Sequence, residues 1–566
     1  MNKFLGNYKL KATPFNEPKP GMNKIVITTI HYGNQEMILE KDVPVKMKDG
    51  VTLYVDVFRP DKPGKFPVVM SADTYGKDTF SPFVAMRPIW PTICSFPTSD
   101  FTALESPDPG FWVPNDYVLI KVALRGSAKS EGELHAWSTA EAEDYCQVIE
   151  WAGIQEWSNG NVGTNGVSYL AVTQWKAASL NPSHLKAMIP WEGLSDVYRE
   201  IAFHGGMPNT GFFRRWAGSL PERWPDKKQV NLVQMQAEHP LIDEYWENNT
   251  PDLTNITIPM LVCASWSTVG LHNRGTFEGF KQAASKDKWL VVHGRKEWES
   301  YYSRESLELQ KAFFDYYLKG IENDWKDRPH VRLEVREKFY DGQNRFENEW
   351  PIARTKYTEL YLDGTDMILS AKPSEKETIL SYQSDPKHIE NDELRFKITF
   401  EENTELTGYM KLKLWVSAED ADDMDIFAGI KKFDKRNNEV YLPDFNHIDN
   451  GQVSSGWLRV SHRELDEKKS TSYQPWHTHK KLQKLSKDEI VPVEIEIWPS
   501  STLFKAGESL ELVIKGSEII TEDSLLGDGL PQRYTHFETV NKGKQLFYMG
   551  GKFDSFLLVP VIPCED

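Results

Sequence analysis

Two kinds of hydrophobic pattern alternate over the first 330 residues of this chain. Continuous apolar runs occupy residues 66–72, 117–123, 162–167, 185–190, 258–264 and 288–293. Between them, apolar residues return with helical spacing over residues 139–155, 170–179, 276–285 and 304–319. Continuous runs are typical of strands that are buried on both faces of a sheet. Their alternation with helices predicts an α/β layered domain with a largely parallel sheet.

A hairpin is expected before the first of these strands. Asp49 and Gly50 form a two-residue turn signal between the strand-like segments 43–47 and 51–59. Such a pair provides the positive backbone angles that tight hairpin turns need.

The pattern changes twice further along the chain. Residues 194–255 carry little strand signal and have a helical pattern with interspersed Trp, Phe and Arg, which is typical of a lid or cap inserted into a domain. After residue 330 short alternating strands dominate, at residues 358–362, 394–400, 408–416, 426–432, 491–498 and 509–515. Many short strands of this kind predict a β-sandwich or jelly roll.

Composition narrows the class of protein. The chain has 566 residues, of which 40% are apolar and 12% aromatic, and its formal net charge is −17. At roughly 150 residues per domain, this length predicts about three to four domains. The apolar content excludes a disordered protein, and the negative charge disfavours a protein that coats nucleic acid.

Membrane and export signals are not expected. No stretch reaches the ~18 to 20 uncharged apolar residues that a membrane span needs. Residues 1–23 contain no apolar block of the kind found in secretory signals, which favours a cytoplasmic protein. The four cysteines, Cys94, Cys146, Cys263 and Cys564, are widely scattered, as reduced and mostly buried thiols are.

The strongest chemical signal lies at Ser168. An apolar strand from Val162 runs into Gly166-Val-Ser168, and a helix-like pattern follows at once. A serine at a strand-to-helix turn has its hydroxyl exposed by the bend and stands at the positive end of the helix. The strict G-x-S-x-G pattern is not met, because position 170 is Leu. A serine that only caps the helix is the alternative interpretation.

Loops after other predicted strands strengthen the nucleophile interpretation. Tyr75 follows the strand at 66–72, residues 125–132 follow the strand at 117–123, and Trp191-Glu-Gly follows the strand at 185–190. Open α/β sheets place their sites at these carboxyl ends. The loop after an early strand supplies an oxyanion donor in α/β-hydrolases.

These motifs resemble one family of enzymes. The matching residues are Asp49-Gly50-Val-Thr-Leu, Thr74-Tyr75-Gly76-Lys77, Arg125-Gly126 with Ser130-Glu131-Gly132, Gly166-Val-Ser168-Tyr169-Leu, Trp191-Glu-Gly, Trp498-Pro and Lys505-Ala-Gly-Glu. In this order, over residues 40 to 560, the chain resembles the cocaine-esterase / X-prolyl dipeptidyl-peptidase family of α/β-hydrolases. Its members are serine hydrolases that cleave esters, amides or X-Pro peptides.

The resemblance implies both a domain division and site roles. It implies an N-terminal extension (1–35), an α/β-hydrolase domain (36–193 and 256–335), a helical cap (194–255) and a C-terminal, galactose-binding-like jelly roll (340–566). Ser168 would be the nucleophile. The backbone amide of Tyr169 and the phenol of Tyr75 would hold the oxyanion. Family members usually have Gly where Ala171 stands.

The remaining triad positions depart from the family pattern. The slot for the acid holds Thr268, which cannot carry a negative charge, and the slot for the histidine holds Trp298. Because a serine nucleophile needs a base and the base an orienting acid, other residues must take these roles. His293 is the preferred base and His272 the second choice. Glu297 or Glu299 can supply an acid or base from the same loop, whereas His204 is expected to be a packing residue.

Other polar clusters are given structural interpretations. The acidic run from Asp420 to Asp425 lacks the glycine and distal glutamate of an EF-hand loop and is expected to be a solvated turn. His477 and His479 have no nearby residues that complete a tetrahedral metal set. No cofactor and no metal are therefore expected.

The sequence favours a serine hydrolase that cleaves ester or amide bonds, including X-Pro bonds, through an acyl-enzyme. Its partner would be a small ester, amide or short peptide rather than nucleic acid or membrane, and a homodimer is compatible with the broad β domain. A degenerate hydrolase that binds a peptide or acyl ligand with little turnover is the alternative, motivated by Thr268 and Trp298. A carbohydrate-binding role for the β domain alone rests on fold analogy.

Overall fold

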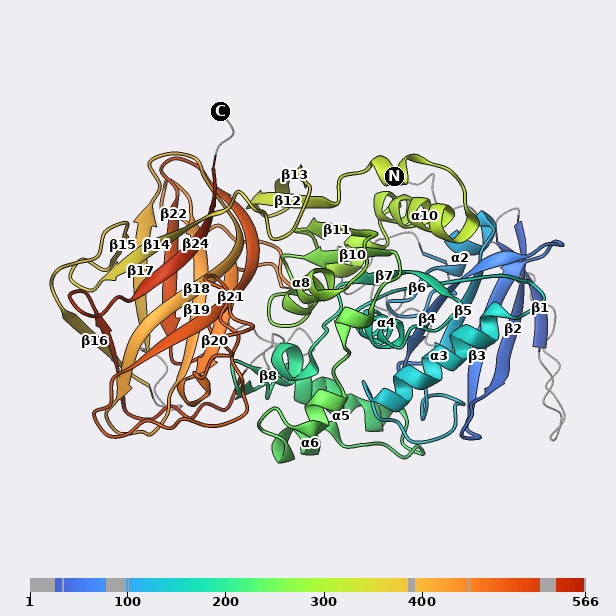
Figure 1. Ribbon diagram of the computed structural model, residues 1–566, viewed down its shortest axis with the longest axis horizontal. Helices are drawn as coiled ribbons and strands as arrows, with labels where there is room; N and C mark the ends of the chain where they lie inside the picture. The colour runs from blue at the N-terminus through green and yellow to red at the C-terminus, as the bar shows by residue number, and fades with distance from the viewer. Residues whose placement is uncertain are drawn as a thin grey trace.

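The computed structural model describes residues 26–32, 35–77, 98–99, 101–384, 392–445, 448–519 and 536–563, with side chains from residue 36 onward. Most of the expected N-terminal extension lies outside these residues, as do Cys94 and Cys564. Figure 1 shows an α/β part, a C-terminal part built from strands, and a group of helices that includes α5 (Phe212–Arg223) and α6 (Leu232–Glu238). Among the described helices, none combines the length and the hydropathy that crossing a membrane requires.

A largely parallel sheet organises the α/β part. Its strand order is β3-β5-β4-β6-β7-β10-β11-β12; β3 is antiparallel to β5, and every later neighbour is parallel. The strands are β3 (Thr52–Pro60), β4 (Phe66–Asp73), β5 (Val118–Ala123), β6 (Ser158–Val167), β7 (Leu185–Trp191), β10 (Met260–Ser265), β11 (Lys288–His293) and β12 (Val331–Lys338). Strands β4 and β5 are buried along their whole length, as continuous apolar runs require. The predicted α/β domain is confirmed.

The expected hairpin stands at the edge of this sheet. Strand β2 (Gln35–Lys46) pairs antiparallel with β3 and also with β1 (Val26–Tyr32), and Lys46 lies opposite Thr52. Gly50 closes the turn with a φ of 94°, a conformation that costs glycine little because it has no Cβ.

Helices follow the strands much as the periodicity predicts. They are α3 (Thr139–Gly153), α4 (Tyr169–Ser179), α8 (Asn273–Gln282), α9 (Glu297–Tyr301) and α10 (Arg304–Lys319). The Ser303 side chain caps α10 by accepting from the Ser306 amide, and Gly320 ends the helix with a φ of 68°. Helix α8 begins earlier than its apolar pattern indicates, which puts His272 at its N-cap.

Residues 194–255 are mostly helical, as expected for an inserted cap. They contain η2 (Tyr198–Ala202), α5, α6, α7 (Glu244–Asn248) and η3 (Leu253–Asn255). A short antiparallel pair, β8 (Phe203–His204) with β9 (Met207–Pro208), was not expected. Gly205 and Gly206 form its turn with φ angles of 55° and 85°, so the pair depends on the turn rather than on a strand-like apolar run.

The C-terminal part is built from strands, as predicted. Its strands are β13 (Asp341–Glu347), β14 (Lys356–Asp363), β15 (Ile368–Ser370), β16 (Thr378–Gln383), β17 (Glu393–Thr399), β18 (Thr404–Ala418), β19 (Asp425–Phe433), β20 (Ser454–Arg459), β21 (Val491–Phe504), β22 (Ser509–Lys515), β23 (Lys544–Met549) and β24 (Phe556–Ile562). Along the first half of β21 buried residues alternate with more exposed ones, the pattern of a half-buried strand. The specific jelly-roll topology stays a prediction.

The two parts meet directly. Strand β12 pairs with β21 at Arg336 and Thr502, so the sheet of the α/β part continues into the β part. Arg336 is buried there, and its guanidinium donates to the Ser501 carbonyl oxygen and to the Ser500 hydroxyl at 3.2 and 2.7 Å. A buried guanidinium needs such acceptors, and here they fix the junction between the two parts.

Candidate active site

Ser168 stands on the sharp turn between β6 and α4. Its backbone has φ 58° and ψ −119°, a strained conformation for a non-glycine residue. Its amide donates to the carbonyl oxygens of Trp191 and Glu192, both at 3.1 Å, while its own carbonyl accepts from Ala171 and Val172. These bonds hold the turn in place, and the bend lifts the hydroxyl off the end of the sheet.

Small residues make the turn possible. A Cβ on Gly166 would lie 2.6 Å from the Leu170 Cβ, and Gly166 has a φ of 149°. A Cβ on Gly193 would lie 2.4 Å from the Ala171 Cβ. The methyl group of Ala171, where the family usually has glycine, therefore fits because position 193 has no side chain.

The histidine that reaches the serine is His272. Its Nε2 lies 3.1 Å from the Ser168 Oγ, within hydrogen-bond distance. The loop after β10 carries it there, because the amides of Leu271 and His272 bind the Thr268 carbonyl at 3.1 and 3.2 Å. The resulting turn places the ring at the start of α8, beside the nucleophile.

A carboxylate accompanies this histidine. Glu297, the first residue of α9, places Oε1 3.5 Å from His272 Nε2, a close approach without the alignment of a hydrogen bond. His272 Nδ1 is buried and has no hydrogen-bond partner in the described residues. Burial lowers the pKa of His272 to about 3, so the ring is neutral near pH 7 and Nε2 can accept a proton.

The histidine and the carboxyl group nearest Ser168 therefore come from the opposite loops to those that the family resemblance implies. The histidine comes from the loop after β10, where the family has its acid, and the carboxylate from the loop after β11, where the family has its histidine. Thr268 and Trp298 occupy the vacated slots.

Tyr75 approaches the site from the loop after β4. Its hydroxyl accepts a hydrogen bond from Trp216 Nε1 on α5 at 3.1 Å, and its ring lies 5.6 Å from the ring of Tyr169. A hydroxyl that accepts from an indole can still donate its own proton. Burial raises the pKa of Tyr75 well above its usual value, so the phenol keeps that proton. Tyr169 begins α4, where a backbone amide has no acceptor within the helix.

A small apolar cavity of about 30 Å³ adjoins Ser168. Trp137 and Trp216 stack over it with ring centres 4.5 Å apart. Its other lining residues are Tyr75, Tyr169, Val172, Leu194, Ile201, Phe212, Leu271 and His272. The aromatic residues of the cap thus lie against the site, and the space beside the hydroxyl holds only a small group.

His293, the base preferred from the sequence, is placed elsewhere. Its Nε2 lies 2.9 Å from Glu192 Oε1 without the alignment of a hydrogen bond, and its Nδ1 accepts from the Arg295 amide at 3.3 Å. Thr268 donates to the same Glu192 carboxylate at 3.1 Å. Because β11 ends at His293, its ring stays at the end of the sheet, whereas the longer loop after β10 carries His272 to Ser168.

Of the other residues that the sequence singled out, Trp298 lies beside the site, whereas Glu299 and His204 have partners elsewhere. Trp298 Nε1 donates to Glu105 Oε1 at 3.1 Å, and Glu105 interacts with the Ser168 side chain. Glu299 instead accepts from the Tyr340 hydroxyl. His204 is buried against Trp457, and its Nδ1 forms a hydrogen bond with His536 Nε2 at 3.1 Å, consistent with a packing role.

Glu105 was not identified from the sequence, whereas Trp216 was expected to be a core residue of the insertion, with a place in the wall of an apolar acyl pocket as the alternative. Glu105 belongs to no motif and follows a segment outside the described residues, and Trp216 stands among several tryptophans of the insertion. The only signal that the sequence offered for Trp216 was an aromatic residue in a segment with a helical pattern.

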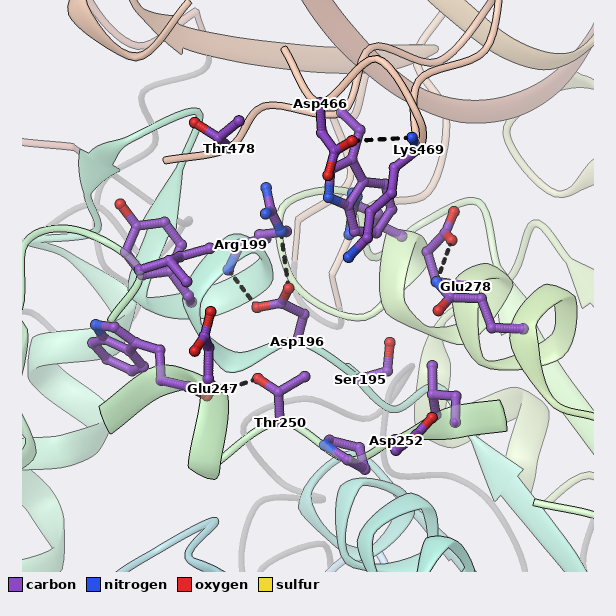
Figure 2. A pocket seen from close by; sticks show the side chains of 18 of the residues that line it. Ser195, Asp196, Arg199, Glu247, Thr250, Asp252, Glu278, Asp466, Lys469 and Thr478 are labelled. Atoms are coloured by element: carbon purple, nitrogen blue, oxygen red, sulfur yellow. Dashed lines mark hydrogen bonds and ion pairs between the residues drawn. The ribbon is translucent and has the colours of Figure 1, made fainter. Parts of the chain in front are cut away.

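A larger cavity of about 650 Å³ lies apart from Ser168 (Figure 2). Residues from the cap, α8 and the β part line it, and Asp196 and Arg199 form an ion pair at 3.0 Å on its wall. Acidic and basic side chains share this wall, as Figure 2 shows for Asp466 and Lys469. Because neither Ser168 nor His272 lines it, the candidate active site is defined by its chemistry and not by cavity size.

A sheet of this order, with a strained serine turn after β6 at the carboxyl ends of its strands, is the arrangement of an α/β-hydrolase. Family comparison agrees: residues 49–296 match the X-Pro dipeptidyl-peptidase (S15 family) model, and residues 323–558 match the X-Pro dipeptidyl-peptidase C-terminal non-catalytic domain. A solved CocE/NonD family hydrolase from Staphylococcus aureus is 60% identical, with a TM-score of 0.93 and 99% of each chain covered.

More distant relatives agree with these matches. Cocaine esterase from Rhodococcus sp. (strain MB1 Bresler) is 26% identical over 92% of this chain and 98% of that protein. A putative Xaa-Pro dipeptidyl-peptidase from Bacillus anthracis is 22% identical over 72% of this chain and 70% of that protein. The chain belongs to the cocaine-esterase / X-prolyl dipeptidyl-peptidase family, and it is a hydrolase with an α/β-hydrolase domain followed by a β domain.

Proposed function

We propose that the chain cleaves esters or amides through an acyl-enzyme formed on Ser168, with His272 as the proton carrier. One observation carries the proposal: the 3.1 Å contact between the Ser168 hydroxyl and His272 Nε2. We propose with it the division of the chain into the hydrolase domain at 36–193 and 256–335, the cap at 194–255 and the β domain from 340.

The first half-reaction follows from this geometry. Ser168 Oγ bonds to the carbonyl carbon of the substrate while its proton passes to His272 Nε2. The carbonyl oxygen becomes negative and receives hydrogen bonds from the Tyr75 phenol and the Tyr169 amide. When the tetrahedral adduct collapses, the bond to the leaving group breaks and the leaving group takes the proton from His272. Water then repeats the sequence on the acyl-enzyme.

Glu297 supports the charged form of the histidine. Once Nε2 carries the serine proton, the positive ring faces a carboxylate oxygen 3.5 Å away. Attraction between unlike charges is strong in a buried site, so the contact stabilises the transition state more than the resting state. Glu297 is thus a positioning residue that acts through His272.

The cavity beside Ser168 favours esters of short acyl groups. About 30 Å³ of space between Trp137, Trp216 and Leu271 accommodates a group of a few heavy atoms, and the apolar walls offer no partner for a charged acyl chain.

The second candidate is a ligand-binding protein with little turnover. The low pKa of His272 favours it, as does its Nδ1, which has no hydrogen-bond partner among the residues that the structure describes, because a histidine that resists protonation is a weak base. The two candidates differ only in rate.

The test compares wild type with Ser168→Ala on p-nitrophenyl acetate and on an X-Pro chromogenic amide. The proposal predicts ester turnover that falls by about 10³-fold or more in the variant, as in other serine hydrolases. Ser183→Ala is the matched control, since Ser183 lies at the surface against Glu150. Turnover that is the same in Ser168→Ala and wild type contradicts the proposal, whereas ligand-dependent stabilisation without product supports the binding protein.

A further inference from the structure

A segment that carries a buried glutamate runs beside the nucleophile turn. The Glu105 carbonyl accepts from the Val167 amide at 3.0 Å, and a Cβ on Gly166 would lie 3.4 Å from that carbonyl oxygen. Glu105 itself has a φ of 60°, in the left-handed region that residues other than Gly, Asn and Asp rarely adopt. Such strain is found mostly where the surroundings hold a side chain for a purpose.

The carboxyl group of Glu105 is buried beside Ser168. Glu105 is 5% exposed, and its Oε1 accepts from Trp298 Nε1 at 3.1 Å. The Ser168 side chain interacts with the same carboxyl group. Oε2 is buried and lacks an aligned hydrogen bond in the described residues. Catalytic hydrogen bonds are often poorly aligned until substrate binds.

The two charged groups that act most strongly on Glu105 are negative. They are Asp73 at the end of β4 and Glu192 after β7, and the phenols of Tyr75 and Tyr302 also face it. Burial first, and then the charge of Asp73, raises the pKa of Glu105 to about 8, against the opposing hydrogen bonds from Trp298 and Ser168. The carboxyl group is therefore mostly protonated at pH 7 and mostly ionised at pH 9.

The serine hydroxyl thus interacts with two possible proton acceptors, His272 and Glu105, whose pKa values differ. His272 is neutral and weakly basic over the whole physiological range, whereas Glu105 becomes a base of useful strength only above neutral pH. A proton acceptor is most effective when its pKa lies near the working pH.

We propose that Glu105 is a second proton acceptor for Ser168, which removes the hydroxyl proton when the carboxyl group is ionised. The inference rests on the proposed function. In this step the Glu105 carboxylate takes the Oγ proton as Oγ bonds to the carbonyl carbon. The carboxylic acid then returns the proton to the leaving group as its bond to carbon breaks. Trp298, in the slot where the family has histidine, holds this carboxyl group in place.

The test is the pH dependence of kcat/KM for p-nitrophenyl acetate between pH 6.5 and 9, corrected for spontaneous hydrolysis. Wild type should rise by up to about thirtyfold, the gain in the ionised fraction of a group with a pKa of about 8. Glu105→Gln keeps the size of the side chain and should lose this rise, which leaves the flat profile of His272 alone.

Two further variants separate a proton carrier from a structural residue. Trp298→Phe removes the hydrogen bond that lowers the Glu105 pKa, so the rise should persist but shift to higher pH. Glu141→Gln is the matched control: Glu141 is another buried carboxyl group with a raised pKa, of about 7, but it binds the Tyr169 hydroxyl. Its removal should leave the rise near pH 8.

The outcomes are distinct. A rise that survives in Glu105→Gln, or one that disappears in Glu141→Gln instead, overturns the inference. Thermal melting checks that each variant is folded; if Glu105→Gln is not, Glu105→Asp replaces it, and the rise should then remain with a lower plateau. Fluorophosphonate labelling of Ser168 keeps the two proposals apart, because labelled and active enzyme without a Glu105-dependent rise refutes only the role of Glu105.

Discussion

The Ser168 hydroxyl and the His272 ring meet at 3.1 Å although they are 104 positions apart in the chain. Ser168 ends the turn after β6, and His272 occupies the N-cap of α8, which follows β10. The parallel sheet brings the carboxyl ends of both strands to one edge, so the contact follows from the fold.

Replacing the histidine should remove most of the activity. His272→Gln is expected to lower kcat by about 10³-fold, because the hydroxyl loses the acceptor for its proton. Steady-state kinetics on p-nitrophenyl acetate at pH 7 measure the effect. His293→Gln is the matched control, since His293 contacts Glu192 rather than Ser168. An equal loss in both variants would mean that the loss reflects general damage to the fold.

The charge of Glu297 should affect kcat more than KM. Glu297→Gln removes the carboxylate that faces His272 Nε2 at 3.5 Å, and we expect kcat to fall by about 10- to 100-fold with KM nearly unchanged. Glu299→Gln is the comparison, because Glu299 accepts a hydrogen bond from the Tyr340 hydroxyl. A larger effect on KM than on kcat would assign Glu297 to substrate binding instead.

The Tyr75 phenol should matter for the chemical step. Tyr75→Phe keeps the ring and removes the donor, so kcat should fall by about 10²- to 10³-fold, as when one oxyanion donor is removed elsewhere. Trp216→Phe removes the indole N–H that binds the Tyr75 oxygen at 3.1 Å and should give a smaller loss in the same direction. If Tyr75→Phe retains full activity in steady-state assays, the phenol is not an oxyanion donor.

The buried histidine at the cap should make stability depend on pH. Burial lowers the pKa of His204 to about 3, whereas the unfolded chain has an ordinary value near 6.5. The unfolded state thus binds the proton more readily, and stability that is complete above pH 6.5 is lost as the pH falls toward 3. At pH 5 this effect amounts to about 2 kcal/mol.

Buried carboxyl groups with raised pKa values titrate in the opposite sense, so a variant is needed to isolate His204. Denaturant unfolding of wild type and His204→Asn at pH 7.5 and pH 5 provides the comparison. The variant should lose about 2 kcal/mol less than wild type on this acidification. Equal losses in the two proteins would show that burial does not lower the pKa of His204.

Much of this architecture can be predicted from sequence because local patterns determine it. The apolar runs located strands β4, β5, β6, β7, β10 and β11, and helix α10 begins at Arg304 and ends at Lys319 as its periodicity indicates. The Gly166-Val-Ser168 segment located the strained turn, because a strand, a glycine and a helix start stand next to one another. Burial, turn chemistry and capping act over a few residues and leave a visible pattern.

The partners of Ser168 were harder to predict, because they depend on where loops travel. His272 follows β10 and His293 ends β11 of the same sheet, and only the tight turn at Thr268 determines which ring reaches the hydroxyl. Glu105 is held near Ser168 by a backbone hydrogen bond from the Val167 amide, which joins segments that are distant in the chain. The sequence pattern records neither relationship, since each arises when separate elements pack together.

The most direct test of the account is active-site labelling with a fluorophosphonate, followed by peptide mass spectrometry. Wild type should carry a single adduct on Ser168, His272→Gln should be labelled much more slowly, and His293→Gln should be labelled at the wild-type rate. Failure to label Ser168 in folded wild-type protein, or equal labelling rates in wild type and His272→Gln, would contradict the account.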